Sequence, residues 1–318
     1  MKPIVIMPTY NERDNIKVLI RAVLDVDPAL HVLVVDDNSP DGTGDLARQL
    51  ARETGRVELL PRAGKMGLGS AYKAGFAYAL ARGYSHMVEM DADGSHRPED
   101  LGRLLAAAER ADVVIGSRNV PGGRTEGWTW PRQVISKGGS LYARTILRLK
   151  IKDCTSGYKC FRREVLDTLD LASMQSNGFG FQVEMNYLCQ QAGFTVTEVP
   201  IIFPDRRQGR SKMSSRIFLE ALLLVWRLRL RPAPPLLPIR IDSRRGHAAD
   251  AVPPAAFPLE LPRVLKNVAF SGLSEKEEGY RSAKQGEIVK PNPRTDLPRK
   301  VIADDMSPDG WPEMKGAV

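Results

Sequence analysis

The sequence has few cysteines and no long hydrophobic run. Its three cysteines, Cys154, Cys160 and Cys189, form no pair with zinc-ligand spacing, and the odd number indicates buried thiols in a reducing compartment. No run of about twenty apolar residues occurs, so we expect no membrane-spanning helix. The apolar stretch after Met1 is too short for a secretory signal peptide. These absences argue against a disulfide-stabilised secreted protein and against an integral membrane protein.

Positive charge is in excess. The 318 residues include 46 Lys and Arg against 38 Asp and Glu, giving a formal net charge of +8. The content of 42% hydrophobic and 26% charged residues is typical of a soluble globular protein. A basic protein suits anionic partners such as phosphorylated substrates, acidic lipid surfaces or nucleic acid, and charge alone does not choose among them.

Short apolar runs alternate with amphipathic segments in the first part of the chain. The expected strands are 4–7, 32–35, 57–60, 86–90 and 112–115, and the expected helices are 14–24, one from Thr43, one ending near Ala81 and one from Pro98. Asn11 is expected to cap the first helix. This alternation predicts a parallel α/β sheet with right-handed crossovers.

Two aspartates, Asp91 and Asp93, follow the apolar run that ends at Met90. Carboxylate oxygens are preferred ligands of Mg²⁺, which is usually held by one or two carboxylates and completed by substrate phosphates and water. The pattern therefore suggests a nucleotide diphosphate site. Taken alone it is weak, because aspartates after a strand are more often turn formers.

Other polar residues also follow expected strands. In open α/β sheets, ligands bind beyond the carboxyl ends of the strands. Five residues fall at such ends: Tyr10, Glu12, Asp37, Asp93 and Arg118. The glycine-rich stretch 64–72 matches neither a Walker loop nor a dinucleotide fingerprint, so it is either a loop that a nucleotide approaches or a plain helix start.

The regular alternation stops after Arg118. We expect a mobile loop over 121–128, a helix over 131–149, a turn-rich segment over 153–159, a helix starting at about Gln182 and a last strand over 194–203. Arg132 and Ser136 share a face of the 131–149 helix and suit a phosphate, with an exposed salt bridge as the alternative for Arg132. The basic stretch 205–212 either folds over a pyrophosphate or is a solvated charged loop.

The segment 214–230 combines many leucines with Trp226 and three flanking arginines. It suits a helix lying in a membrane interface, and a helix packed on the sheet is the alternative. From Pro232 onwards the chain is rich in proline and lacks periodicity, which predicts a mostly disordered tail or peripheral appendage over 231–318.

Taken together, these motifs resemble a known family. They are Pro8-Thr9-Tyr10-Asn11-Glu12, Asp36-Asp37-Asn38-Ser39-Pro40-Asp41-Gly42-Thr43, Gly67-Leu68-Gly69-Ser70-Ala71-Tyr72, Met90-Asp91-Ala92-Asp93, Gly116-Ser117-Arg118, Phe181-Gln182-Val183-Glu184-Met185, and Asp205-Arg206 with Ser211-Lys212. In this order they are similar to the family-2 inverting glycosyltransferases, specifically the dolichol-phosphate (polyprenol-phosphate) mannosyltransferases. The resemblance covers about residues 1–230.

The resemblance implies a GT-A fold, a GDP-mannose donor, a polyprenyl phosphate acceptor and a Mg²⁺ or Mn²⁺ ion. The implied donor-binding residues are Pro8, Tyr10, Glu12, Val35, Asp37, Ala92, Arg206 and Lys212. Asp91 and Asp93 match metal positions, and Asp93 and Arg118 are the implied catalytic residues. Arg118, Arg132 and Ser136 resemble acceptor-phosphate contacts, with Gln182 and Glu184 on the sugar side.

The chain also departs from the family pattern. Some relatives carry Gln where Ser95 stands, and some carry transmembrane helices after the catalytic domain. We therefore expect peripheral attachment to the cytoplasmic face of a membrane, through the 214–230 helix, a membrane-anchoring partner protein or both. UDP-glucose is the alternative donor and a soluble glycan or protein the alternative acceptor. Nucleic-acid binding is not expected, because no reading motif is recognisable.

Overall fold

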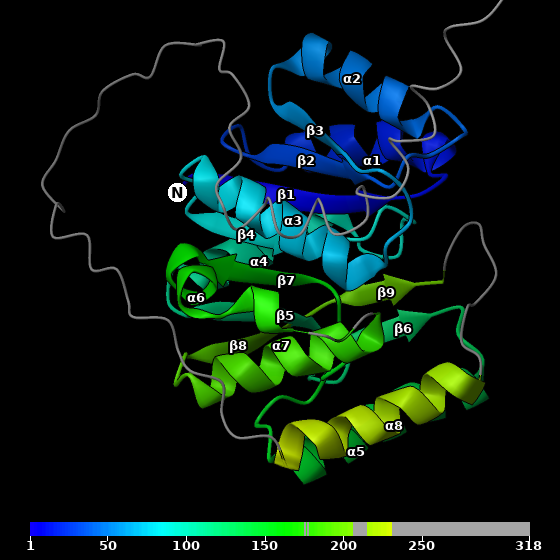
Figure 1. Cartoon of the computed structure of the whole chain (residues 1–318), viewed down its shortest axis with the longest axis vertical. Coiled ribbons are helices and arrows are strands. Elements are labelled where there is room, and N and C mark those ends of the chain that lie inside the picture. The colour runs from blue at the N-terminus through cyan, green and yellow to red at the C-terminus, as the bar shows by residue number, and fades with distance from the viewer. Residues whose placement is uncertain (175, 177, 206–214, 231–318) are drawn as a thin grey trace, which may run out of the picture. The chain divides into compact units, whose positions relative to one another are not determined.

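The computed structural model describes residues 1–174, 176, 178–205 and 215–230. A seven-stranded sheet with the order β3-β2-β1-β4-β7-β5-β8 lies at the centre of these residues (Figure 1). Its strands are β1 (Pro3–Thr9), β2 (His31–Asp36), β3 (Val57–Pro61), β4 (His86–Glu89), β5 (Val113–Ser117), β7 (Lys159–Arg162) and β8 (Val196–Pro200). Every pairing is parallel except the two that β7 makes, with β4 and with β5.

Helices cover both faces of this sheet, which explains the nearly continuous apolar runs of its strands. Along β1, Ile4 and Ile6 pack on one face, while Val5 and Met7 pack on the other. The first face carries α3 (Leu68–Ala81), α6 (Arg163–Thr168) and α7 (Phe179–Gln191), and the second carries α1 (Arg13–Leu24), α2 (Thr43–Thr54) and α4 (Leu101–Ala108). The predicted mostly parallel, helix-flanked α/β architecture is confirmed.

Two further helices lie side by side at one end of this unit (Figure 1). They are α5 (Trp130–Leu147) and α8 (Ser215–Leu230), and α8 also packs against α7. The predicted helices over 131–149 and 214–230 are therefore both present. None of the helices in the described part of the chain is both long enough and apolar enough to cross a membrane. The predicted tail, 231–318, lies outside the described residues.

The segment between β5 and α5 differs from its prediction. The expected loop over 121–128 contains strand β6 (Arg124–Glu126), which pairs in parallel with β9 (Ile202–Pro204). The expected strand over 194–203 is divided into β8 and β9, with Ile201 between them. The backbone N–H of Arg124 donates to the Ile201 carbonyl at 3.0 Å, and that of Ile201 donates to the Ser117 carbonyl at 3.1 Å. These long-range hydrogen bonds order a segment that looks like a loop in isolation.

The start of α1 also differs from its prediction. Asn11 does not cap the helix. It adopts a left-handed conformation with φ of 62°, and the capping position belongs to Glu12. The backbone N–H of Asn11 instead donates to Ser39 Oγ at 3.0 Å, so this residue joins the loop after β1 to the loop after β2. Both loops belong to the edge of the sheet that carries the candidate site.

Candidate active site

The carboxyl ends of β1, β2, β4 and β5 bring most of the predicted site residues to one edge of the sheet. Because these strands are parallel, the residues that follow them emerge on the same side. The backbone N–H of Asp37 donates to the Thr9 carbonyl at 3.0 Å, and that of Met90 donates to the Ile6 carbonyl at 3.1 Å. The loops that contain Tyr10, Asp37 and Asp91 are thereby linked to one another through the backbone.

The turn that carries Asp91 and Asp93 is held by side chains around it. Tyr72 donates its hydroxyl to Asp91 Oδ1 at 3.1 Å, and Asp93 Oδ1 accepts from the backbone N–H and the hydroxyl of Ser95 at 3.0 and 2.6 Å. The backbone N–H of Asp91 donates to His96 Nδ1 at 2.9 Å, so Nε2 carries the ring proton of neutral His96. Both carboxylates therefore have set orientations.

This donor set fits a divalent cation whose coordination is completed by substrate. No group of three or more His, Cys, Asp or Glu side chains within the described ranges could hold a metal ion. Two carboxylates with phosphate oxygens and water are the usual environment of Mg²⁺. The Ser95 hydroxyl donates to Asp93 and so orients its carboxylate.

Asp37, a predicted donor residue in the loop after β2, forms a buried ion pair. Arg62 lies 3.1 Å from Asp37, and the two side chains are 6% and 10% exposed. Burial raises the pKa of Asp37, and the positive charge of Arg62 opposes that rise. Sequence reasoning missed Arg62. It directly follows β3, so the rule that site residues follow parallel strands could have found it.

Tyr10 and Glu12 lie in the loop after β1. Tyr10 is 39% exposed, and Lys65 Nζ lies 4.4 Å from the centre of its ring. Glu12 accepts from the side-chain amide of Asn15 at 2.9 Å. Pro8 and Val35 are paired across β1 and β2, and the Val35 side chain is fully buried in the core, as Ala92 nearly is. An exposed aromatic ring beside an ammonium group is suited to binding the base and phosphates of a nucleotide.

Arg118 is bound to a carboxylate that sequence reasoning did not single out. Its Nε and one terminal nitrogen donate to the two oxygens of Asp153 at 2.7 and 2.6 Å, and its backbone N–H donates to Asp153 at 3.0 Å. Both residues are buried. Burial alone would raise the pKa of Asp153, but the Arg118 guanidinium holds it below its ordinary value. The Arg118 guanidinium group therefore already makes a bidentate contact with Asp153. Its predicted contact with substrate phosphates stays a prediction.

Arg132 and Ser136 lie one turn apart on α5, as predicted. Arg132 forms an ion pair with Asp205 at 2.6 Å, which is the salt bridge considered as the alternative. Its guanidinium lies 4.0 Å from the centre of the Trp128 ring, and that of Arg118 lies 5.5 Å from the same ring. Trp128 therefore connects the two arginines expected at the acceptor phosphate. Arg206 and Lys212 lie outside the described residues, so their donor contacts stay predictions.

The side chains of Gln182 and Glu184 point in different directions, because residues two positions apart on a helix do not face each other. Glu184 accepts from the backbone N–H of Ser176 at 3.2 Å. Gln182 is 2% exposed and lies toward Asp91 across Gly157. A methyl group on Gly157 would lie 3.6 Å from Gln182 Nε2 and 3.9 Å from Asp91 Oδ2. The structure therefore brings Gln182 next to the aspartate turn.

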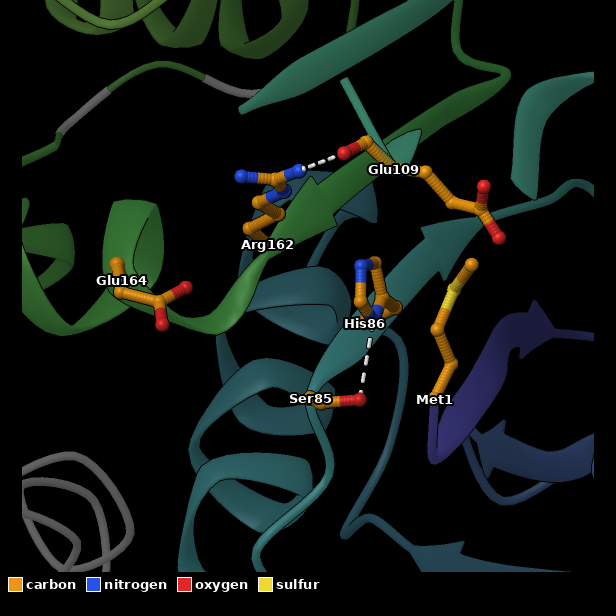
Figure 2. Close-up of a pocket in the computed structure, with 6 residues that line it drawn as sticks. All are labelled: Met1, Ser85, His86, Glu109, Arg162 and Glu164. Carbon is orange, nitrogen blue, oxygen red and sulfur yellow. Dashed lines mark hydrogen bonds between the residues drawn. The ribbon is translucent and has the colours of Figure 1, made fainter. Parts of the chain in front are cut away.

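A separate pocket of about 350 Å³ lies at the opposite edge of the sheet (Figure 2). It is lined by Met1, Ser85, His86, Glu109, Arg162 and Glu164. Arg162 donates to the Ala108 carbonyl at 2.8 Å and so binds the C-terminal end of α4, and Ser85 bonds to the His86 ring at 2.9 Å. None of the predicted site residues lines this pocket.

Known proteins match this chain over most of its length. Residues 4–170 match the family model described as glycosyl transferase family 2. Polyprenol monophosphomannose synthase of Mycolicibacterium smegmatis is 49% identical over 77% of this chain and 91% of its own length. Undecaprenyl-phosphate mannosyltransferase of Micrococcus luteus is 49% identical over 71% of this chain and 93% of its own.

A solved structure shows the same fold at low sequence identity. Glucosyl-3-phosphoglycerate synthase from Mycobacterium tuberculosis, in complex with phosphoglyceric acid, aligns with a TM-score of 0.53 at 16% identity. The alignment covers 73% of this chain and 81% of that one. The central sheet and its flanking helices are those of a GT-A glycosyltransferase. With a family model matched over just over half of its length and relatives at 49% identity, the chain belongs to glycosyl transferase family 2.

Proposed function

We propose that the chain transfers mannose from GDP-mannose to a polyprenyl phosphate with inversion, giving polyprenyl β-D-mannosyl phosphate. The two relatives at 49% identity are named for mannose and for polyprenol or undecaprenyl phosphate, which supports this donor sugar and this acceptor class. The aspartate turn beside the Asp37 and Tyr10 loops supports a nucleotide diphosphate donor.

The observation that carries the proposal is the composition of α5. This helix bears Arg132 and Ser136, and on the same helix Trp130, Val134 and Ile135 are 76%, 47% and 47% exposed. A phosphate-binding arginine among exposed apolar side chains suits an acceptor with a charged head and an apolar chain. A water-soluble acceptor would not require that apolar surface.

The exposed apolar surface continues onto α8. There Leu223, Trp226 and Leu230 are 62%, 50% and 78% exposed, next to the exposed arginines Arg227 and Arg229. We define these residues, with Trp130, Val134, Ile135 and Leu141 of α5, as the α5–α8 surface. Apolar and basic side chains together are typical of helices that lie at an anionic membrane surface. This supports peripheral attachment, with the cytoplasmic face as the expected side.

The proposed mechanism is a single displacement at the sugar. The acceptor phosphate is ionised near neutral pH, so one of its oxygens attacks the sugar C1 without a strong general base. The bond from C1 to the diphosphate breaks, and GDP departs. Asp91 and Asp93 would hold Mg²⁺ or Mn²⁺, which stabilises the negative charge of the departing diphosphate. Arg132 and Ser136 orient the attacking phosphate, and Gln182 lies on the sugar side.

The test is transfer of labelled mannose to a short polyprenyl phosphate in detergent, with and without Mg²⁺. Asp93→Ala should lower turnover roughly 100-fold or more, because the diphosphate charge is no longer stabilised. Asp25→Ala is the matched control, since it removes an exposed carboxylate at the C-terminal end of α1, and it should keep full turnover. The product should extract into organic solvent and carry a β linkage.

Three outcomes would contradict the proposal in different ways. Near-normal turnover by Asp93→Ala under saturating Mg²⁺ would refute the mechanism. Product from UDP-glucose but not from GDP-mannose would keep the mechanism and replace the donor. A water-soluble product would replace the acceptor.

A further inference from the structure

Lys159 is a fully buried lysine directly beneath the candidate site. It begins β7 and lies opposite Glu89 of β4 in the antiparallel register, and both residues are 0% exposed. Its ammonium group donates to the backbone carbonyl of Gln182 on α7 at 3.1 Å. Lys159 therefore joins β7, which pairs with the strand that leads to Asp91, to the helix that bears the sugar-side glutamine.

Lys159 and Glu89 influence each other without a close ion pair in the described part of the chain. Burial lowers the pKa of Lys159, and the negative charge of Glu89 opposes this. Burial raises the pKa of Glu89 to about 7, opposed by Lys159 and by the Gln182 amide, although Glu89 and Gln182 do not meet full hydrogen-bond geometry. Glu89, Lys159 and Gln182 thus form one buried polar cluster.

Burying a charged side chain of this kind is energetically unfavourable. Removing an ammonium group from water costs several kcal/mol in a protein, and an apolar residue of similar volume is often as stable or more stable there. The hydrogen bond from Lys159 to a helix carbonyl adds a fixed distance between β7 and α7, which a methionine would not supply. The cluster therefore contributes geometry more than stability.

This buried cluster borders the space around Gly157, which lies two residues before Lys159. Gln182 Nε2, His96 Cε1 and Asp91 Oδ2 would lie 3.6, 3.7 and 3.9 Å from a methyl group on Gly157. The Gln182 amide has no hydrogen-bond partner among the described residues, and it is buried beside the aspartate turn. A small movement of α7 relative to β4 would change the distance between this amide and Asp91.

We infer that Lys159 is a positioning residue for sugar transfer, which fixes the Gln182 amide relative to the Asp91–Asp93 turn. This inference rests on the proposed function. It assigns Lys159 no contact with substrate. A misplacement of about 1 Å in an active site can lower turnover roughly 100-fold, so the loss should appear in kcat and much less in nucleotide binding.

The test compares Lys159→Met with the double variant Glu89→Gln/Lys159→Met in the full-length chain. The single variant leaves Glu89 buried without its opposing charge, so it should lose stability. The double variant removes both charges and should recover the melting temperature. Lys73→Met is the matched control, because Lys73 also donates to a backbone carbonyl, but to that of Met174 at 2.9 Å and not to that of Gln182.

For each protein we would measure the melting temperature, the affinity for GDP with Mn²⁺ by calorimetry, and kcat and KM for mannose transfer. The inference expects the double variant to regain stability and GDP affinity while kcat stays roughly 100-fold low. Recovery of kcat together with stability would overturn the inference, since Lys159 and Glu89 would then only neutralise each other's charge. Failure of both variants to fold would also overturn it, because Lys159 would then serve the fold alone. Absence of transfer by the unmodified protein would refute the proposed function before any substitution is made.

Discussion

Gly157 lies where a side chain would occupy the space between the aspartate turn and Gln182. An added methyl group would make contacts of 3.6 to 3.9 Å, which are ordinary van der Waals distances. An alanine therefore fits the protein. The added methyl group would, however, fill the space that a substrate group would need between Asp91 and Gln182. A substitution at Gly157 therefore tests the site without disturbing the fold.

Gly157→Ala should therefore keep the melting temperature and lower the rate of mannose transfer by roughly tenfold or more. Gly102→Ala on α4 is the matched control, since its methyl group would meet only Val26 Cγ1 at 3.8 Å, and it should leave transfer unchanged. Calorimetric melting and initial rates check both variants. Full activity of Gly157→Ala would mean that substrate does not use this space.

The pair of Arg118 and Asp153 predicts a second effect of single residues. Asp153→Ala leaves a buried guanidinium without its carboxylate, which should cost about 3–5 kcal/mol of unfolding free energy, as measured in urea. Glu126→Ala breaks the exposed pair with Arg124 and should cost at most about 1 kcal/mol. Equal losses in the two variants would contradict the assignment of a structural role to Asp153.

The same pair has a defined pH dependence. The pKa of Asp153 is lowered from its ordinary value of 3.8, so its ionised form is favoured in the folded state. The stability that it contributes is fully present above the unfolded pKa and is lost as the pH falls through the lower, folded pKa. The difference between the unmodified protein and Asp153→Ala should therefore be constant near neutrality and shrink below about pH 3.8. A difference that shrinks already at neutral pH would point to another group.

At the scale of elements, the α5–α8 surface is the proposed site of membrane attachment. Trp226→Ser/Leu230→Ser should weaken binding to anionic vesicles by about tenfold or more, because two large apolar side chains no longer enter the interface. Val18→Ser on α1 removes another exposed side chain, 68% exposed, and should leave binding unchanged. Co-sedimentation with phosphatidylglycerol vesicles measures this, and an equal loss in the control would contradict the assignment.

Elements also differ in how well the sequence predicts them. The buried parallel strands and the helices between them follow from apolar runs and periodicity, which are local. Strands β6, β7 and β9 are three or four residues long and depend on partners far along the chain. Such short segments carry too few side chains for a periodic pattern, so their pairing is visible only in the structure.

At the scale of the molecule, the sequence motifs of the candidate site all lie between residues 8 and 212. A chain truncated after Leu230 should therefore retain mannose transfer with an unchanged kcat. Truncation before Ser215 removes α8, which contributes Val225 and Leu228 to the core, and should lower stability as well as vesicle binding. Loss of transfer in the first truncation would mean that residues 231–318 take part in the reaction.

The sequence by itself determined the α/β architecture, the edge of the sheet that carries the site, and the family. These depend on local apolar patterns and on motifs that follow parallel strands. Only the tertiary structure decided the partners of the buried charges. Arg118 with Asp153, Asp37 with Arg62, and Lys159 with Gln182 are separated in sequence by 35, 25 and 23 residues. Partners at such distances are brought together by the crossing of strands and helices, which no local pattern encodes.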